Sequence, residues 1–217
     1  AGKWIEISAP NFPNVIKDPD APDKNKYTLG RLSFNIFQPK NLVCTLEGVT
    51  NTVAICKEEK EDSSDDVSST YTYDVLQDLT VHTDKGDVPA TLLVNGKCYP
   101  DVTKKNRVTA VFTAGELRRG KEVNQDPQMR QIWEDTFHEA YTNAEKERGY
   151  VSAFGMWLMK LAFKLTLPTD ESDSESCTRY EMKRAPKGYL DILYVDEDLR
   201  ITRGNRGTVV IVQRAKE

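Results

Sequence analysis

The sequence predicts a mainly β protein, an antiparallel barrel or sandwich, with one long helix. Many short segments alternate apolar and polar residues with a period of two, and turn-forming residues separate them. Only one stretch repeats its apolar residues at spacings of three and four, as a helix does. A chain of 217 residues can bury well over half of its unfolded surface, so we expect a single domain over residues 1–217.

Composition argues against a nucleic-acid partner and against a metal or other cofactor. The net charge is -4, whereas binding to phosphates needs clustered cations. The four cysteines include no Cys-x-x-Cys pair, and with only two histidines a zinc site is not expected. The cysteines are expected to be thiols, with one disulfide as the alternative.

The N-terminal quarter predicts two strand regions separated by a loop. Trp4 to Ile7 indicates a short strand, and residues 9–27 contain four prolines and indicate a long loop. Leu32, Phe34 and Ile36 alternate with polar residues, which predicts a half-buried strand.

The next segment predicts a strand with a bend at Gly48. Its apolar residues change parity there, which predicts a β-bulge at this glycine. The apolar residues are Leu42, Cys44 and Leu46 before the change, and Val49, Val53 and Ile55 after it.

The strongest strand signal begins at Tyr71. Tyr71, Tyr73, Val75, Leu79 and Val81 share one face, which Gln77 interrupts. The run 84–87 predicts a hairpin turn into a strand over 88–94, Asn95-Gly96 is a second turn signal, and residues 108–112 predict another short strand.

Helical spacing begins after Asp126, a good N-cap, and Pro127, a good first helical residue. The sequence predicts a helix from about Pro127 to Arg148, with Gly149 as a stop, which packs on or plugs one barrel end. Residues 156–167 favour a strand, with a helix as the alternative. The acidic runs 57–70 and 169–176 predict solvated loops, or an acidic functional patch in the case of 57–70.

Residues 177–182, 189–195, 199–202 and 208–214 complete the predicted strands, and the run 204–207 predicts a hairpin turn between the last two. None of these segments carries a recognisable catalytic motif. Catalytic triads need a histidine beside a nucleophile, and His82 and His138 are both better explained as surface or packing residues. Asp196 and Asp198 lie two apart and could act as acid and base, but a charged turn is the simpler interpretation. We therefore expect no enzymatic activity.

The C-terminal stretch runs from Gly188 through Asp198-Leu199-Arg200-Ile201 and Arg203-Gly204 to a Val-rich end at 209–212. It resembles the closing signature of the plastid lipid-associated (fibrillin) proteins, which are built like lipocalins. Gly2-Lys3-Trp4 is similar to the Gly-x-Trp of the first lipocalin strand, and Leu29-Gly30-Arg31 to an element of the second family strand. The resemblance implies a lipocalin-like antiparallel barrel in which Arg200 or Arg203 stacks on Trp4 to close the base.

The resemblance also implies a non-enzymatic plastid (chloroplast) protein at the thylakoid or plastoglobule. It would bind lipids, isoprenoids or other hydrophobic small molecules, or a lipid surface. Strand parity makes the cavity candidates Leu32, Phe34, Ile36, Tyr71, Tyr73, Val75, Gln77 and Leu79. These side chains could instead fill a solid core. The alternatives are a structural or assembly subunit of a photosynthetic membrane complex, with protein partners, and an enzyme acting on a lipid inside the barrel.

Overall fold

A computed structural model gives the structure of the protein and describes residues 1–8, 14–17, 19, 24–56, 70–146, 165–166 and 177–216. Side chains are described for these ranges except 138–146, 165–166 and 177. The strands are β1 (Gly2–Glu6), β2 (Lys26–Thr28), β3 (Val43–Ile55), β4 (Tyr71–Thr83), β5 (Gly86–Pro100), β6 (Arg107–Arg119), β7 (Leu165–Thr166), β8 (Cys177–Met182), β9 (Lys187–Val195), β10 (Leu199–Gly204) and β11 (Val209–Arg214). The helices are α1 (Leu29–Leu32), α2 (Lys121–Gln125) and α3 (Pro127–Lys146).

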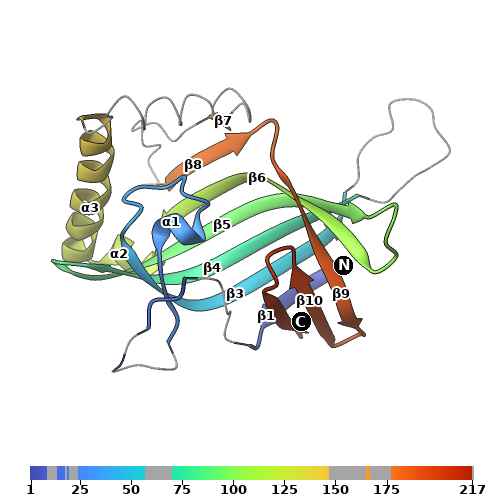
Figure 1. The fold of residues 1–217 in the computed structure, drawn as a ribbon. Coiled ribbons are helices and arrows are strands. Elements are labelled where there is room, and N and C mark those ends of the chain that lie inside the picture. The colour runs from blue at the N-terminus through green and yellow to red at the C-terminus, as the bar shows by residue number, and fades with distance from the viewer. Residues whose placement is uncertain are drawn as a thin grey trace.

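Eight of the strands close into an antiparallel barrel (Figure 1). Strands β1, β3, β4, β5, β6, β9, β10 and β11 pair in this order, and β11 returns to pair with β1. This up-and-down order follows the chain, and closure leaves these strands no free edge along the ring. The sequence-based expectation of a mainly β, antiparallel barrel with one long helix is confirmed.

Strand β6 changes partner along its length, and this divides the barrel into two halves. Its first part, Arg107–Val111, pairs with β9 and closes the ring. Its second part, Ala114–Arg118, pairs instead with β8, which carries β7. In this second half, Figure 1 shows α1 within the curve of the sheet and α3 across its end.

Two glycines mark irregularities in the long strands. The predicted bulge at Gly48 is confirmed, because the register of β3 against β4 shifts between Leu46 and Gly48. The turn predicted at Asn95-Gly96 is wrong. These residues continue β5, and the register against β6 shifts there. A Cβ on Gly96 would meet the Val111 carbonyl oxygen at 2.7 Å, so glycine permits the close approach of β6.

The strand predicted over Leu32, Phe34 and Ile36 is wrong. Leu29–Leu32 form the short helix α1, which starts where the Thr28 hydroxyl accepts a hydrogen bond from the Arg31 amide at 3.2 Å. Phe34 then has a φ of 54°, a turn conformation that no strand contains. Leu32 and Ile36 are both buried, and their spacing of four lets one compact turn bury both.

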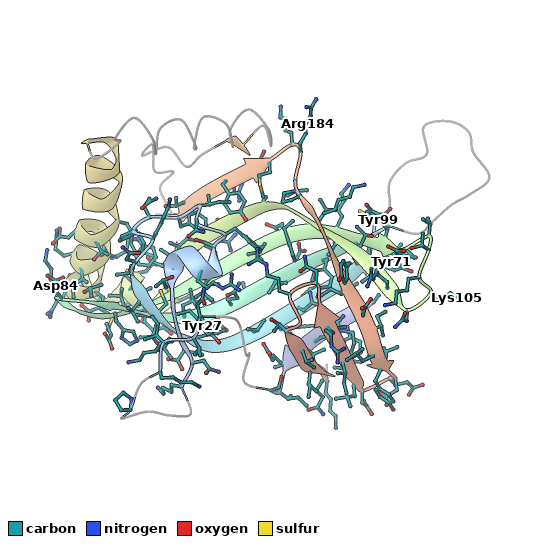
Figure 2. The ribbon with its side chains drawn as sticks, viewed as in Figure 1. Tyr27, Tyr71, Asp84, Tyr99, Lys105 and Arg184 are labelled. Atoms are coloured by element: carbon teal, nitrogen blue, oxygen red, sulfur yellow. The ribbon has the colours of Figure 1, made fainter. Side chains whose placement is uncertain are left out.

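Helix α3 confirms the predicted long helix. The Asp126 carboxylate caps its start by accepting hydrogen bonds from the Gln128 and Met129 amides at 2.8 and 3.3 Å. Its buried face carries Ile132, Trp133 and Phe137. Figure 2 places Asp84, in the β4–β5 turn, beside this helix, so α3 packs against one end of the barrel as expected.

The other strand predictions have clear outcomes within the described residues. Both predicted hairpin turns, over 84–87 and 204–207, are confirmed.

Among the described cysteines, Cys44, Cys56 and Cys98 are free thiols. The stop at Gly149, the acidic runs 57–69 and 169–176, and residues 156–164 lie outside the described residues, while Leu165–Thr166 form β7. None of the helices in the described ranges has both the length and the apolar character needed to cross a membrane.

The packing of Tyr180 on Gly115 generates a prediction about the core. A Cβ at Gly115 would lie 2.4 Å from the Tyr180 ring, which also packs edge-on to Phe37 at 5.5 Å between centroids. We expect Gly115→Ala to reduce the free energy of unfolding by about 1–3 kcal/mol, because the buried ring has to move. Denaturant unfolding measures this. Gly188→Ala is the matched control, since its Cβ would meet Ala110 at an ordinary 3.7 Å; equal losses in both variants would contradict the packing argument.

Candidate ligand-binding site inside the barrel

The inside of the barrel consists of a filled half and a lined half. The filled half lies toward α1 and α3, and its inward side chains are fully buried, as in Leu79, Val81, Val88, Leu92 and Leu117. The lined half lies where β6 pairs with β9. Several of its inward side chains remain partly exposed, namely Val53, Tyr71, Tyr73, Val75 and Phe112, whereas Trp4, Cys98 and Ala110 on the same wall are buried. A closed ring of strands whose inward side chains still contact solvent is not filled by them.

Aromatic rings mark the boundary between the two halves. Phe112 lies 6.0 Å from Tyr73 and 5.9 Å from Phe34, measured between ring centroids. Phe34 is 51% exposed although it contacts this inward-facing ring. The segment after α1 therefore presents an aromatic side chain to the lined half without filling it.

The predicted cavity residues are distributed over both halves. Tyr71, Tyr73 and Val75 belong to the lined half, Gln77 follows them on the same face of β4, and Leu79 lies in the filled half. Leu32 and Ile36 are part of the hydrophobic core, while Phe34 lies at the boundary. A role of these residues in ligand binding stays a prediction.

Two arginines stack on Trp4, which is buried at the β1–β11 junction. The Arg200 guanidinium lies 4.9 Å and that of Arg214 lies 4.4 Å from the centre of the indole ring. Arg214 also donates to the backbone carbonyls of Glu197 and Ala1. Arg203, the other arginine expected at this position, is exposed on β10, because it alternates with the inward-facing Arg200 and Thr202.

The backbone conformation and the surroundings of Gly2 explain why this position, two residues before Trp4, is a glycine. A Cβ at Gly2 would lie 2.4 Å from the Arg214 guanidinium, and the φ of Gly2 is 134°. Both observations require glycine there. Arg214 was missed by the sequence analysis. Arg214 could have been found by pairing the first strand with the last in antiparallel register, because Trp4 then lies opposite Arg214.

A relay of hydrogen bonds holds the Arg200 side chain. Its guanidinium donates to the Asn51 side-chain oxygen at 2.5 Å, and Asn51 donates to the Asp74 carbonyl at 2.9 Å. The Asp74 carboxylate in turn accepts from Asn95 at 2.9 Å. Arg200 is thus oriented by β3, β4 and β5, on the opposite side of the indole from its own strand.

One row of inward-facing residues combines the polar groups of the lined half. On β10, β11 and β1 it consists of Arg200, Val212 and Glu6, and on β3 and β4 of Val49 and Gln77. The β1–β3 register, in which Ile5 lies opposite Thr50, continues to Glu6 opposite Val49. The polar members alternate with valines. The Glu6 Oε1, Gln77 Oε1 and Arg200 Nε atoms are buried and have no hydrogen-bond partner in the described part of the chain. An unpaired buried polar group costs about 1–3 kcal/mol. The filled half also contains such atoms, the Arg119 Nε and Nη1 and the Tyr180 hydroxyl oxygen, but among the described residues only this row brings three such residues together across neighbouring strands.

Burial sets the protonation of this row. It raises the pKa of Glu6 to about 7, against which a hydrogen bond from Ser8 acts. It lowers the pKa of Arg200. The pKa of Tyr73 is raised by burial, while Arg200 lowers it and Glu6 raises it, so all three groups share one electrostatic environment. Glu6 was also missed by the sequence analysis, although its position two residues after Trp4 puts it on the same face of β1.

The candidates for chemistry lie elsewhere. His82 is on the outer side of β4, 2.7 Å from the Thr45 hydroxyl and 2.9 Å from the Asp87 carboxylate. Asp196 accepts hydrogen bonds from the Asp198 and Leu199 amides, as in a charged turn. The side chain of His138 lies outside the described residues. No group of histidine, cysteine or acidic residues in the described ranges could hold a metal ion.

An eight-stranded up-and-down barrel, closed by arginines on a first-strand tryptophan, defines a lipocalin-like protein. The PAP_fibrillin family model matches residues 101–213, which is more than half of the chain. The chain belongs to this family of plastid lipid-associated proteins, as its C-terminal signature indicated. No curated protein and no solved structure matches the sequence.

The stacking on Trp4 predicts unequal roles for two arginines. We expect Arg214→Met to lower the free energy of unfolding by about 1–2 kcal/mol, because it removes a cation–π contact and two hydrogen bonds to carbonyls. Arg203→Met should change it by less than about 0.5 kcal/mol, as for an exposed side chain. Denaturant unfolding compares the two variants. A larger loss from Arg203→Met would contradict the closure described for this barrel.

The raised pKa of Glu6 predicts a pH-dependent stability. The folded chain holds a proton that the unfolded chain, with a pKa near 4.5, releases. Stability therefore falls as pH rises from 4.5 to about 7, and the loss is complete above that pH. We expect Glu6→Gln to stabilise the chain by about 1–2 kcal/mol at about pH 8, after allowance for solvent screening, and to have no effect at about pH 4. Paired unfolding titrations measure this, and a gain that does not vary with pH would refute the assignment.

Proposed function

We propose that the chain is a non-enzymatic plastid protein that binds a hydrophobic small molecule, of the lipid or isoprenoid class, in the lined half of its barrel. The observation that carries this proposal is the partial exposure of Tyr71, Tyr73, Val75 and Phe112 on the inner wall. Ligand sites of this kind are concave and mostly apolar, with a few placed polar groups. Arg200, Glu6 and Gln77 match the polar part.

The division of the interior supports a binding role. The filled half supplies a continuous hydrophobic core from α1, α3 and the long strands. Because that core stabilises the fold, the lined half does not need to be filled for the chain to fold. The position of His82 supports the proposal that the protein is not an enzyme, because His82 lies on the outer wall, away from the lined half.

The location is proposed from the family and from the outer wall. Members of the family are plastid-associated, and we propose a peripheral site at the thylakoid or plastoglobule. An apolar row crosses the outer face of β9, β10 and β11 through Tyr194, Ile201 and Ile211, and reaches Ile7, the residue after β1. Ile7 is 56% and Tyr194 is 49% exposed. This row also favours the second candidate function, a structural subunit of a photosynthetic membrane complex, since exposed apolar patches mark interaction surfaces.

The proposed function predicts that protein purified from its source contains a bound lipid. We expect the chain purified from its source to carry a stoichiometric isoprenoid, pigment or acyl lipid, which organic extraction and mass spectrometry would identify. Empty protein that co-purifies with subunits of a membrane complex would instead favour the second candidate.

A pair of variants separates a ligand inside the barrel from one outside it. Val75→Trp should reduce the bound lipid at least tenfold, because the indole would occupy the lined half. Leu76→Trp is the matched control, since Leu76 is the next residue of β4 and faces outward. Equal loss, or equal retention, in two folded variants would contradict binding inside the barrel.

A further inference from the structure

The polar row of the lined half has a defined hydrogen-bonding complement. Glu6 and Gln77 each present a buried side-chain oxygen without a partner, and Arg200 presents a buried Nε–H without one. A carboxylate or amide oxygen accepts hydrogen bonds, and a guanidinium N–H only donates them. A molecule that satisfies this row must therefore both donate and accept.

The row places its donor, Arg200, near one of its two acceptors, Glu6. Arg200 and Glu6 are separated by a single inward position, Val212, with which both are in register. Their strands lie two spacings apart, about 10 Å, on a wall that curves inward. Both charges act on Tyr73, since Arg200 lowers and Glu6 raises the pKa of that residue.

Arg200 cannot turn away from this position. One of its guanidinium nitrogens is held by Asn51, and its plane lies over Trp4. The Nε–H that is left unpaired is thus presented in a fixed place. A preorganised donor of this kind loses little conformational entropy when a ligand binds.

The charges of the row further restrict which ligand head groups fit it. Arg200 and an ionised Glu6 carry opposite charges, so the row is close to neutral overall. Above about pH 7, where Glu6 is ionised, a carboxylate ligand would bring only acceptor atoms to the oxygens of Glu6 and Gln77. A diphosphate would meet one free arginine donor, because Arg214 already donates to two carbonyls. A pure hydrocarbon would leave all three buried polar atoms unpaired.

We propose that the lined half selects an apolar molecule with a neutral hydroxyl head group, an alcohol or a phenol. The hydroxyl donates to Glu6 and accepts from the Arg200 Nε–H, and the apolar part lies against the Tyr73, Phe112 and Phe34 rings. Gln77, two strands beyond Glu6, takes a second polar atom of the ligand or a bridging water. This inference rests on the proposed function, since it assigns the ligand chemistry of the same site.

The experiment compares three ligands that differ in the head group only. Titration calorimetry of the full chain with farnesol, farnesyl methyl ether and farnesoate measures three affinities. We expect farnesol to bind about tenfold more tightly than the ether, which can accept but not donate, and more tightly than farnesoate. This comparison uses the unaltered chain, so it does not depend on whether a variant folds.

Two variants test whether the preference for farnesol depends on the polar row. Glu6→Leu should abolish the preference for farnesol over the ether, because it removes the acceptor that farnesol alone can use. Asp78→Asn is the control, because Asp78 is exposed on the outer face of β4 next to Gln77. It should keep the full preference.

The possible outcomes separate the two proposals. Binding of all three ligands with equal affinity, or tightest binding of farnesoate, would overturn the hydroxyl selection and leave the hydrophobic site standing. Preference for farnesol that survives Glu6→Leu would also overturn it. No binding of any of the three to the emptied protein would instead count against the proposed function itself.

Discussion

The pairing of the first strand with the last is the constraint on which the rest of the structure depends. Trp4 lies opposite Arg214 in that pairing, and Arg200 lies over the same indole ring from β10. These contacts join residues about two hundred positions apart, so the loop entropy of the whole chain opposes them. Once formed, they determine the register that places Glu6 and Arg200 on either side of Val212.

The change of partner along β6 gives the two ends of one barrel different properties. Where β6 pairs with β8, the opened sheet curves around α1 and buries a continuous core. Where it pairs with β9, the ring is closed and its inner wall keeps contact with solvent. The first half supplies the stability that allows the second to contain a glutamate, a glutamine and an arginine with unpaired buried atoms. The hydrophobic core and the row of Arg200, Glu6 and Gln77 are thus separated along the barrel.

Features that depend on neighbouring residues were predictable. The bulge at Gly48 follows from a change of parity, the start of α3 from Asp126 and Pro127, and the closing hairpin from the run 204–207. The family resemblance also came from a continuous stretch at the C-terminus. In each case, the residues that decide the structure lie within one turn or one strand of each other.

The predictions that failed concern long-range partners. Leu32 to Ile36 has strand spacing, but burial against β4 and β5 favours a helix and a turn. Asn95-Gly96 is a turn signal, yet pairing of both residues with β6 keeps them in β5. The sequence by itself thus determined most of the strands, the long helix and the family, because periodicity and capping are local. Only the tertiary structure decided which arginines stack on Trp4 and which half of the barrel is lined, because both depend on register between strands remote in the chain.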